Sequence, residues 1–171
     1  PNIQVIENLN WDDASGIGLI TGAKSGISAI DIDDSGLALL IPLLFDHHPL
    51  LVSTARNRGH MYVQEIDGAS ASSKFFVVYQ GRDICIELKG NGTQVAMPPS
   101  PNYQWLLCHT KTDEHKSEPF KVSSIADAWE FIMDCINYEY GNDTITFKEP
   151  THVNTGPRTW SSHVQEGARN D

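Results

Sequence analysis

The chain has 171 residues, which is enough for one compact domain with or without a tail. Hydrophobic residues make up 40% of the chain and charged residues 20%, which is typical of a globular protein and excludes a disordered one. The net charge of −10 argues against a protein that coats nucleic acid by bulk attraction. Residues 24–89, however, carry six basic against eight acidic side chains, so this region is compatible with a polyanionic ligand.

Nothing in the sequence predicts membrane insertion or secretion. The apolar run from Ser35 to Phe45 is too short to cross a bilayer and is interrupted by Pro42. The chain has no basic start followed by an apolar stretch, as a signal peptide would. Its three cysteines are far apart and form no CxxC pair, which favours free thiols in a reducing compartment. We therefore expect a protein that is not secreted and does not enter a membrane.

Short strands separated by Gly, Asn and Ser turns are predicted between residues 16 and 107. Residues 17–21 and 27–33 flank a Gly-rich turn and predict a β-hairpin. The apolar segment 37–45 predicts a short buried helix that Pro42 distorts. Segments rich in Val, Ile, Phe and Tyr predict further strands at residues 50–54, 60–66, 74–80, 83–88, 94–97 and 103–107.

One amphipathic helix is predicted after these strands, at residues 124–140. Ser124 followed three residues later by Asp127 predicts its capping box, and Gly141 predicts its end. Its apolar residues recur at spacings of three and four, on one face: Ile125, Trp129, Ile132 and Ile136. Many strands and few helices predict an α+β fold in a single domain.

The chain becomes polar after residue 141 and contains several Pro and Gly residues. We therefore predict a folded domain at residues 1–141 and a polar linker or C-terminal tail at residues 142–171. Because the chain starts at Pro1 rather than Met, we expect the domain to be truncated at its N-terminal end.

The strongest local motif is the Asp31-Ile32-Asp33 sequence in the predicted strand 27–33. Residues two apart in a strand point to the same face, so Ile30 and Ile32 enter the core while Asp31 and Asp33 lie side by side on the other face. Two carboxylates at this spacing repel each other unless a cation or a proton lies between them. The pair is therefore either a metal site or a pair of solvated acids at a strand end.

A third acid, Glu87, lies on the predicted strand 83–88. The apolar residues at 84, 86 and 88 define the buried face, so Glu87 lies on the opposite face, just before a Gly-Asn-Gly turn. Strand ends before such turns often present functional groups. The alternative is a glutamate on a polar face, paired with Lys74 or Lys89.

A basic turn lies between these acids in the sequence. Arg56, Arg58 and Gly59 precede a strand on which His60 and Tyr62 share a face. Guanidinium groups and loop backbone suit phosphate oxygens, and a histidine can donate a hydrogen bond to a phosphate as well. A solvated basic turn without a ligand is the alternative.

Taken in order, these motifs resemble the primase-polymerase (prim-pol) family of the archaeo-eukaryotic primase superfamily, whose members are found largely in plasmids, phages and other viruses. The matching segments are residues 16–22, residues 25–33 with the two aspartates, Arg58-Gly59-His60-Met61-Tyr62, and Glu87 to Ser100 with its Pro-Pro-Ser end. The resemblance covers about residues 16–107. It implies an archaeo-eukaryotic primase catalytic core, in which an RRM-like antiparallel sheet is flanked by helices.

The resemblance implies a template-dependent nucleotidyltransferase, a DNA primase and DNA polymerase that adds nucleotides to a 3′-hydroxyl by two-metal-ion catalysis in replication. The metal ligands for Mg²⁺ or Mn²⁺ would be Asp31, Asp33 and Glu87, and these acids together with His60 would be the catalytic residues. The family more often has Asp where this chain has Glu87. The nucleotide phosphates would be bound by Arg56, Arg58, His60 and Lys89.

The resemblance also implies partners: a DNA template and primer, dNTP or NTP, no membrane, and a C-terminal helicase in the full-length protein. It places the protein in the cytoplasm or at a site of viral or plasmid replication. A zinc site is not expected, because the spacing of Cys108, His109, His115 and Cys135 is not that of a zinc finger.

Two other functions remain open. A metal-dependent nuclease could use Glu87-x-Lys89, the spacing found at strand ends of restriction-endonuclease-like folds, but it leaves the Asp31/Asp33 pair and Arg58-Gly59-His60 without clear roles. A catalytically inactive nucleic-acid-binding module would carry the same acids merely as exposed side chains. A sugar-nucleotide transferase with an Asp-x-Asp motif is disfavoured, since no parallel βαβ units are predicted.

Overall fold

The computed structural model describes residues 14–44, 50–54, 56–66, 70–107 and 119–148, together with Asp12 and Gly68. The helices are α2 (Ser35–Leu40), the 3₁₀ helix η1 (Ile41–Leu43) and α3 (Ile125–Tyr140). The strands are β1 (Ile17–Ile20), β2 (Ser28–Ile32), β3 (Leu50–Ser53), β4 (Gly59–Glu65), β5 (Ser73–Tyr79), β6 (Arg82–Lys89), β7 (Gln94–Met97), β8 (Gln104–Leu107), β9 (Phe120–Val122) and β10 (Ile145–Phe147). None of the helices in these ranges is long and apolar enough to span a bilayer.

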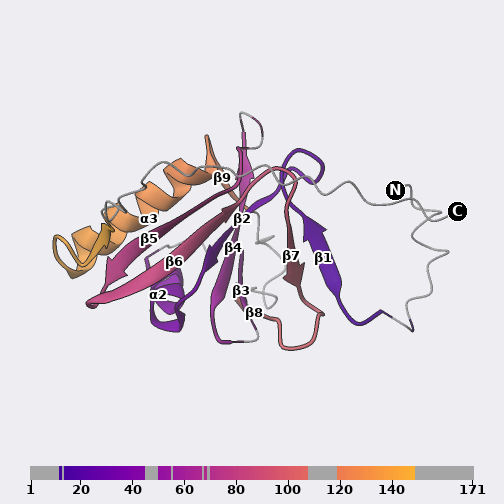
Figure 1. The fold of residues 1–171 in the computed structure, drawn as a ribbon, viewed down its shortest axis with the longest axis horizontal. Helices are drawn as coiled ribbons and strands as arrows, with labels where there is room; N and C mark the ends of the chain where they lie inside the picture. Colours follow the sequence, from indigo (N-terminus) through magenta and orange to yellow (C-terminus); the bar gives the residue numbers. More distant parts are fainter. Residues whose placement is uncertain are drawn as a thin grey trace, which may run out of the picture.

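An eight-stranded sheet forms the centre of the fold, in the order β10-β5-β6-β2-β4-β3-β8, with β9 paired to β4 (Figure 1). Among the described strands only β9 pairs in parallel; the other pairings are antiparallel. The predicted α+β class is therefore confirmed, as a mostly antiparallel sheet with few helices.

Both α2 and α3 pack on the same face of this sheet. The apolar alternation of β2 and β6 supplies that face with Ile30, Ile32 and Ile86, which are fully buried against Leu37 of α2 and Trp129 of α3. Burying side chains of this size stabilises the fold by about 1.5–3 kcal/mol each, which fixes which face of each strand turns inward. Because alternate residues point the other way, Asp31 lies on the face that the helices leave uncovered.

The two predicted helices are present, with small shifts at their ends. The Asp34 side chain accepts a hydrogen bond of 2.8 Å from the Leu37 N–H, so α2 begins two residues before the predicted start, and it passes into η1 at Ile41. The Ser124 hydroxyl accepts a bond of 3.1 Å from the Asp127 N–H, and Gly141 ends α3 at a φ of 110°. The four apolar residues predicted to share one face of α3 are all buried.

The predicted hairpin between residues 17 and 33 is wrong. An isolated bridge joins Gly22 to Ile27, but β1 pairs along its length with β7, with Ile17 opposite Met97. The resulting two-stranded ribbon, visible on the right in Figure 1, lies at the opposite end of the view from α3. Its Val95 packs with Tyr62 and other residues of the sheet in a second, smaller core. The ribbon therefore covers part of the face that carries Asp31.

The sheet continues past residue 141, where the folded domain was predicted to end. Residues 145–147 form β10, which adds to the sheet beside β5. Ile145 is fully buried, and the Asn137 side chain of α3 bonds to both its N–H and its carbonyl at 2.9 Å. The fold therefore continues at least to Lys148, and the rest of the predicted tail lies outside the described residues.

Candidate active site

The pairing of three central strands brings together residues that lie far apart in the sequence. Asp31 lies in β2, directly opposite His60 of β4 on one side and Glu87 of β6 on the other. Directly opposite residues in antiparallel strands share a face, with Cβ atoms about 4.5–5.5 Å apart. Asp33 follows two positions beyond Asp31, and its N–H continues the β2–β6 pairing by donating to the Cys85 carbonyl. One face of the sheet therefore carries the three predicted acids and the predicted histidine.

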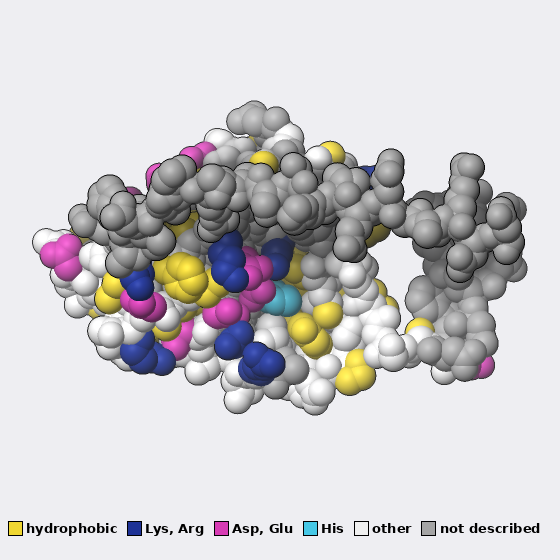
Figure 2. Space-filling view, viewed as in Figure 1, with side chains coloured by type: hydrophobic (Ala, Val, Ile, Leu, Met, Phe, Trp, Pro, Cys, Tyr) yellow, Lys and Arg dark blue, Asp and Glu magenta, His cyan; other side chains and the backbone are white. Residues whose placement is uncertain are grey.

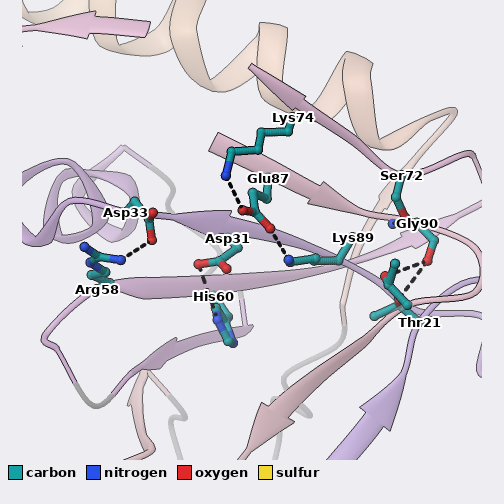
Figure 3. A network of polar contacts seen from close by, with 11 residues as sticks. Thr21, Asp31, Asp33, Arg58, His60, Ser72, Lys74, Glu87, Lys89 and Gly90 are labelled. Carbon is teal, nitrogen blue, oxygen red and sulfur yellow. Dashed lines mark hydrogen bonds and ion pairs between the residues drawn. The ribbon is translucent and has the colours of Figure 1, made fainter. Parts of the chain in front are cut away.

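Each of the three acids is held by a basic side chain (Figure 3). Arg58 Nη1 donates to Asp33 Oδ1 at 2.6 Å, and His60 Nε2 lies 3.4 Å from Asp31 Oδ1. Glu87 accepts from Lys74 Nζ at 2.9 Å through one oxygen and from Lys89 Nζ through the other. Figure 2 shows the same arrangement from outside: carboxylates and a histidine near the centre of this face, bordered by Lys and Arg.

The two lysines determine the charge state of Glu87. Its hydrogen bonds from Lys89 and Lys74 lower the pKa of the carboxyl from 4.5 to about 2, and this effect exceeds the opposing effect of partial burial. Glu87 in turn raises the pKa of Lys74. The site therefore contains a permanently ionised carboxylate between two ammonium groups at neutral pH.

His60 is the one histidine among the described residues, and its side chain is only 8% exposed. The ring lies between Asp31 and the Tyr103 ring, whose centroid is 5.9 Å away. Since an ionised carboxylate can only accept, the contact with Asp31 favours a proton on Nε2. His60 Nδ1 is buried and has no hydrogen-bond partner among the described residues, which is uncommon outside ligand-binding or strained sites.

The basic turn contributes unequally to this site. Arg58 reaches Asp33, whereas Arg56 is exposed and forms no ion pair with the three acids in the described part of the chain. Gly59, which follows Arg58 at the start of β4, has a packing role. A Cβ at this position would lie 2.7 Å from the Ala38 Cβ of α2, so the glycine allows the helix to pack tightly behind β4.

The three acids resemble a divalent-cation site in two ways: their side chains are carboxylates, and they lie on adjacent strands. Mg²⁺ and Mn²⁺ prefer carboxylate oxygens, and Asp31, Asp33 and Glu87 present three carboxylates on adjacent strands. Their side chains point to basic partners, however, and no three His, Cys, Asp or Glu groups among the described residues are close enough to hold a metal ion. A cation bound here would therefore compete with Arg58, His60 and the lysines for the same oxygens. Cys108, His109 and His115 lie outside the described residues.

An open pocket of about 290 Å³ adjoins Glu87, between β5, β6 and the turn before β7. It is lined by Ser72, Ser73, Lys74, Glu87, Leu88, Lys89 and Thr93. From the sequence, Lys74 is predicted only as one of two alternative partners of Glu87. Its position directly opposite Glu87 depends on the β5–β6 register, which the alternation within β5 alone does not reveal.

Comparison with known proteins gives one match. The family model described as "Bifunctional DNA primase/polymerase, N-terminal" (Prim-Pol) matches residues 3–119, which is more than half of the chain. Neither the curated proteins nor the solved structures include a match. The matched range contains every residue predicted for the site, and the chain therefore belongs to the Prim-Pol family of DNA primase/polymerase nucleotidyltransferases.

Proposed function

We propose that this chain is the catalytic domain of a template-dependent DNA primase/polymerase, built on an archaeo-eukaryotic primase core with an RRM-like sheet. The observation that supports the proposal best is the register that sets Asp31 between His60 and Glu87 on the sheet face opposite the helices. Central strands hold side chains rigidly, and nucleotidyl transfer depends on such positioning. Family membership supports DNA and nucleotides as the substrates.

In this proposal Asp31, Asp33 and Glu87 hold Mg²⁺ or Mn²⁺. When bound, such cations make the 3′-hydroxyl a better nucleophile and neutralise charge on the leaving pyrophosphate. Arg58 and Lys89 already contact Asp33 and Glu87, so they are within reach of phosphates placed beside those acids. When a cation takes the place of His60 beside Asp31, the Nε2–H of His60 is free to donate a hydrogen bond to a phosphate oxygen, and Arg56 contributes positive charge from the exposed turn.

The proposal is tested by extension of a labelled primer on a DNA template, and by priming on single-stranded DNA, with Mg²⁺ or Mn²⁺. The variants Asp31→Asn, Asp33→Asn and Glu87→Gln keep the size of each side chain and remove its charge. We expect each to lower the rate about a hundredfold or more, as loss of a directly acting electrostatic group does. Asp83→Asn is the matched control, because Asp83 also lies on β6 in a lysine pair but binds Lys148 instead. Full activity in Asp31→Asn would contradict the proposal.

The same samples distinguish the alternatives. Glu87 and Lys89 contact each other on one face of β6, as the nuclease hypothesis requires. That hypothesis predicts DNA cleavage with metal but without nucleotides, and loss of cleavage in Lys89→Ala. An inactive binding module predicts neither synthesis nor cleavage, and no stabilisation by divalent cations. A C-terminal helicase and an origin in viral or plasmid replication stay predictions from the family resemblance.

A further inference from the structure

An aromatic side chain, Phe76 of β5, lies exposed on the same sheet face as the three acids. Asp31 lies opposite Glu87, and Glu87 lies opposite Lys74, so these three side chains share one face. Phe76 follows Lys74 by two positions in the same strand and therefore points to that face as well. It is 45% exposed, and Figure 2 shows hydrophobic side chains on this face directly beside the carboxylates.

The residue before it, Phe75, shows that β5 supplies the core from its other face. The Phe75 ring lies against Trp129 of α3 and against Phe147 of β10, with ring centroids 6.1 Å and 5.4 Å away. Phe76 points away from this packing, so its ring is available to a ligand. A flat aromatic ring on a sheet face is a surface on which a nucleic-acid base can stack, because every base has a π-face.

The ring lies within a few nucleotides of the acids. Phe76 is directly opposite Cys85 of β6, whose carbonyl accepts a hydrogen bond from the Asp33 N–H at 3.1 Å. Neighbouring strands lie about 4.8 Å apart, so Phe76 is roughly 10 Å from Asp33 across the sheet. Stacked nucleotides follow one another at about 3.4 Å along a strand. A base on Phe76 would therefore lie about three nucleotides from a base held at the acids.

Positive charge borders the ring on two sides. Lys74 precedes it in β5, and the Lys148 N–H donates to the Phe76 carbonyl at 2.9 Å from the neighbouring chain segment. The two lysine side chains are 56% and 37% exposed, although each pairs with a carboxylate. Rings that stack bases, placed among cations that attract the backbone, are typical of surfaces that bind single strands. An apolar protein segment docked on Phe76 would instead have to bury both ammonium groups, which is costly.

We infer that Phe76 stacks a base of the single-stranded template, about three nucleotides from the base that is copied at the acids. The inference rests on the proposed function, which makes a DNA template the ligand of this face. Ahead of the primer end the template bases are unpaired and free to stack, whereas the primer bases are paired. Phe76 thus holds the template in place beside the acids without reading its sequence, because stacking tolerates every base.

The test is binding of a primer–template in EDTA, so that it depends on neither metal nor synthesis. One abasic site is moved along the single-stranded part of the template, and the affinity of the 171-residue chain is measured at each position. We expect binding to weaken about five- to hundredfold at one position or two neighbouring ones, which is the range for loss of one stacked base. No loss at any template position, an equal loss when the abasic site is moved along the primer, or no binding of the primer–template at all would overturn the inference.

Variants of Phe76 identify the ring that the base contacts. Phe76→Ala should bind the intact primer–template about five- to hundredfold more weakly and become insensitive to the abasic site, while Phe76→Tyr should retain both properties. The slope of log affinity against log salt should stay the same in Phe76→Ala, because no cation is lost.

Phe147→Ala is the matched control. Phe147 is similarly exposed, at 49%, but it lies opposite Val77, which is buried on the helix side of the sheet. Equal weakening in the two alanine variants, or unchanged binding in Phe76→Ala, would contradict the inference, and melting temperatures show whether each variant is folded. Primer extension with metal is measured separately, so a chain that binds the template through Phe76 but makes no DNA would refute the proposed function and not the stacking site.

Discussion

Replacing Gly59 with alanine tests how closely α2 packs behind the candidate active site. Gly59 is the first residue of β4 and immediately precedes His60. The added Cβ would lie 2.7 Å from the Ala38 Cβ and 3.5 Å from Leu51 Cδ1. The first distance is shorter than methyl groups tolerate, and Ala38 is buried in α2 without a flexible side chain that could move aside. Either α2 or β4 must shift.

Overpacking of this kind destabilises a protein by about 1–3 kcal/mol. Because the Ala38 methyl is the atom that clashes, Ala38→Gly should relieve part of the cost even though glycine within a helix costs about 1 kcal/mol by itself. The double variant should therefore be more stable than the sum of the two single changes predicts, which is the signature of direct coupling. A shift of β4 also moves His60 relative to Asp31, so DNA synthesis should fall in Gly59→Ala and partly recover in the double variant.

Unfolding by urea gives the four free energies of this cycle, and primer extension gives the four rates. Gly18→Ala is the matched control, because a Cβ on that strand residue would meet its nearest atoms at an ordinary 3.9 Å. An unfolding free energy for Gly59→Ala within about 0.5 kcal/mol of the unaltered chain, the range of surface substitutions, would refute the packing argument. Strict additivity in the double variant would refute the assignment of the clash to Ala38.

Three further predictions concern stability. The pKa of Glu87 is about 2 in the folded state against an ordinary 4.5, so its ion pairs stabilise the fold fully above pH 4.5 and lose this effect as the pH falls toward 2. The difference in unfolding free energy between the chain and Glu87→Gln should therefore shrink from pH 4.5 to pH 2. A difference that stays constant over this range in urea unfolding would contradict the prediction. Asp34 caps α2 and forms an ion pair with Arg82 at 2.9 Å. In urea unfolding, Asp34→Ala should therefore lower the free energy of unfolding by about 1–2 kcal/mol, and Asp34→Asn, which keeps a capping oxygen, should lower it clearly less. The Ser100 hydroxyl accepts from the Ile17 N–H at 2.7 Å and donates to the Ile17 carbonyl at 3.0 Å. Ser100→Ala should therefore lower the free energy of unfolding by about 1 kcal/mol and speed amide hydrogen exchange at Ile17. Unchanged exchange at Ile17 would show that other contacts hold β1 in place.

The local sequence pattern was sufficient to predict on which face of its own strand or helix each of these side chains lies. The alternation around Asp31 and around Glu87 predicted which side chains leave the core, because a strand has a period of two. The spacing of Trp129 and Ile132 likewise predicted the buried face of α3. These features depend on neighbours a few residues away, so one sequence contains them completely.

The same local pattern could not predict which strands that are distant in the sequence pair with each other. The turn at residues 22–26 suits a hairpin, yet β1 pairs with β7, whose residues lie more than 70 positions later in the sequence. The hydrogen bond between Ile17 and Ser100 supports this pairing. The place of Lys74 opposite Glu87 and the addition of β10 beside β5 depend on register in the same way. The role of Gly59 depends on how near α2 comes, which the sequence of β4 does not contain.

The most direct test of the proposed metal site is a Mn²⁺ titration of the chain, followed by electron paramagnetic resonance of the free ion, with and without dNTP. Asp31→Asn/Asp33→Asn is compared with Asp83→Asn, whose acid lies in β6 but pairs with Lys148. We predict that the chain binds Mn²⁺ and that dNTP strengthens this binding, with loss of both effects in the double variant and retention of both in the control. Equal Mn²⁺ binding by the chain and the double variant would show that these two aspartates are not the metal site.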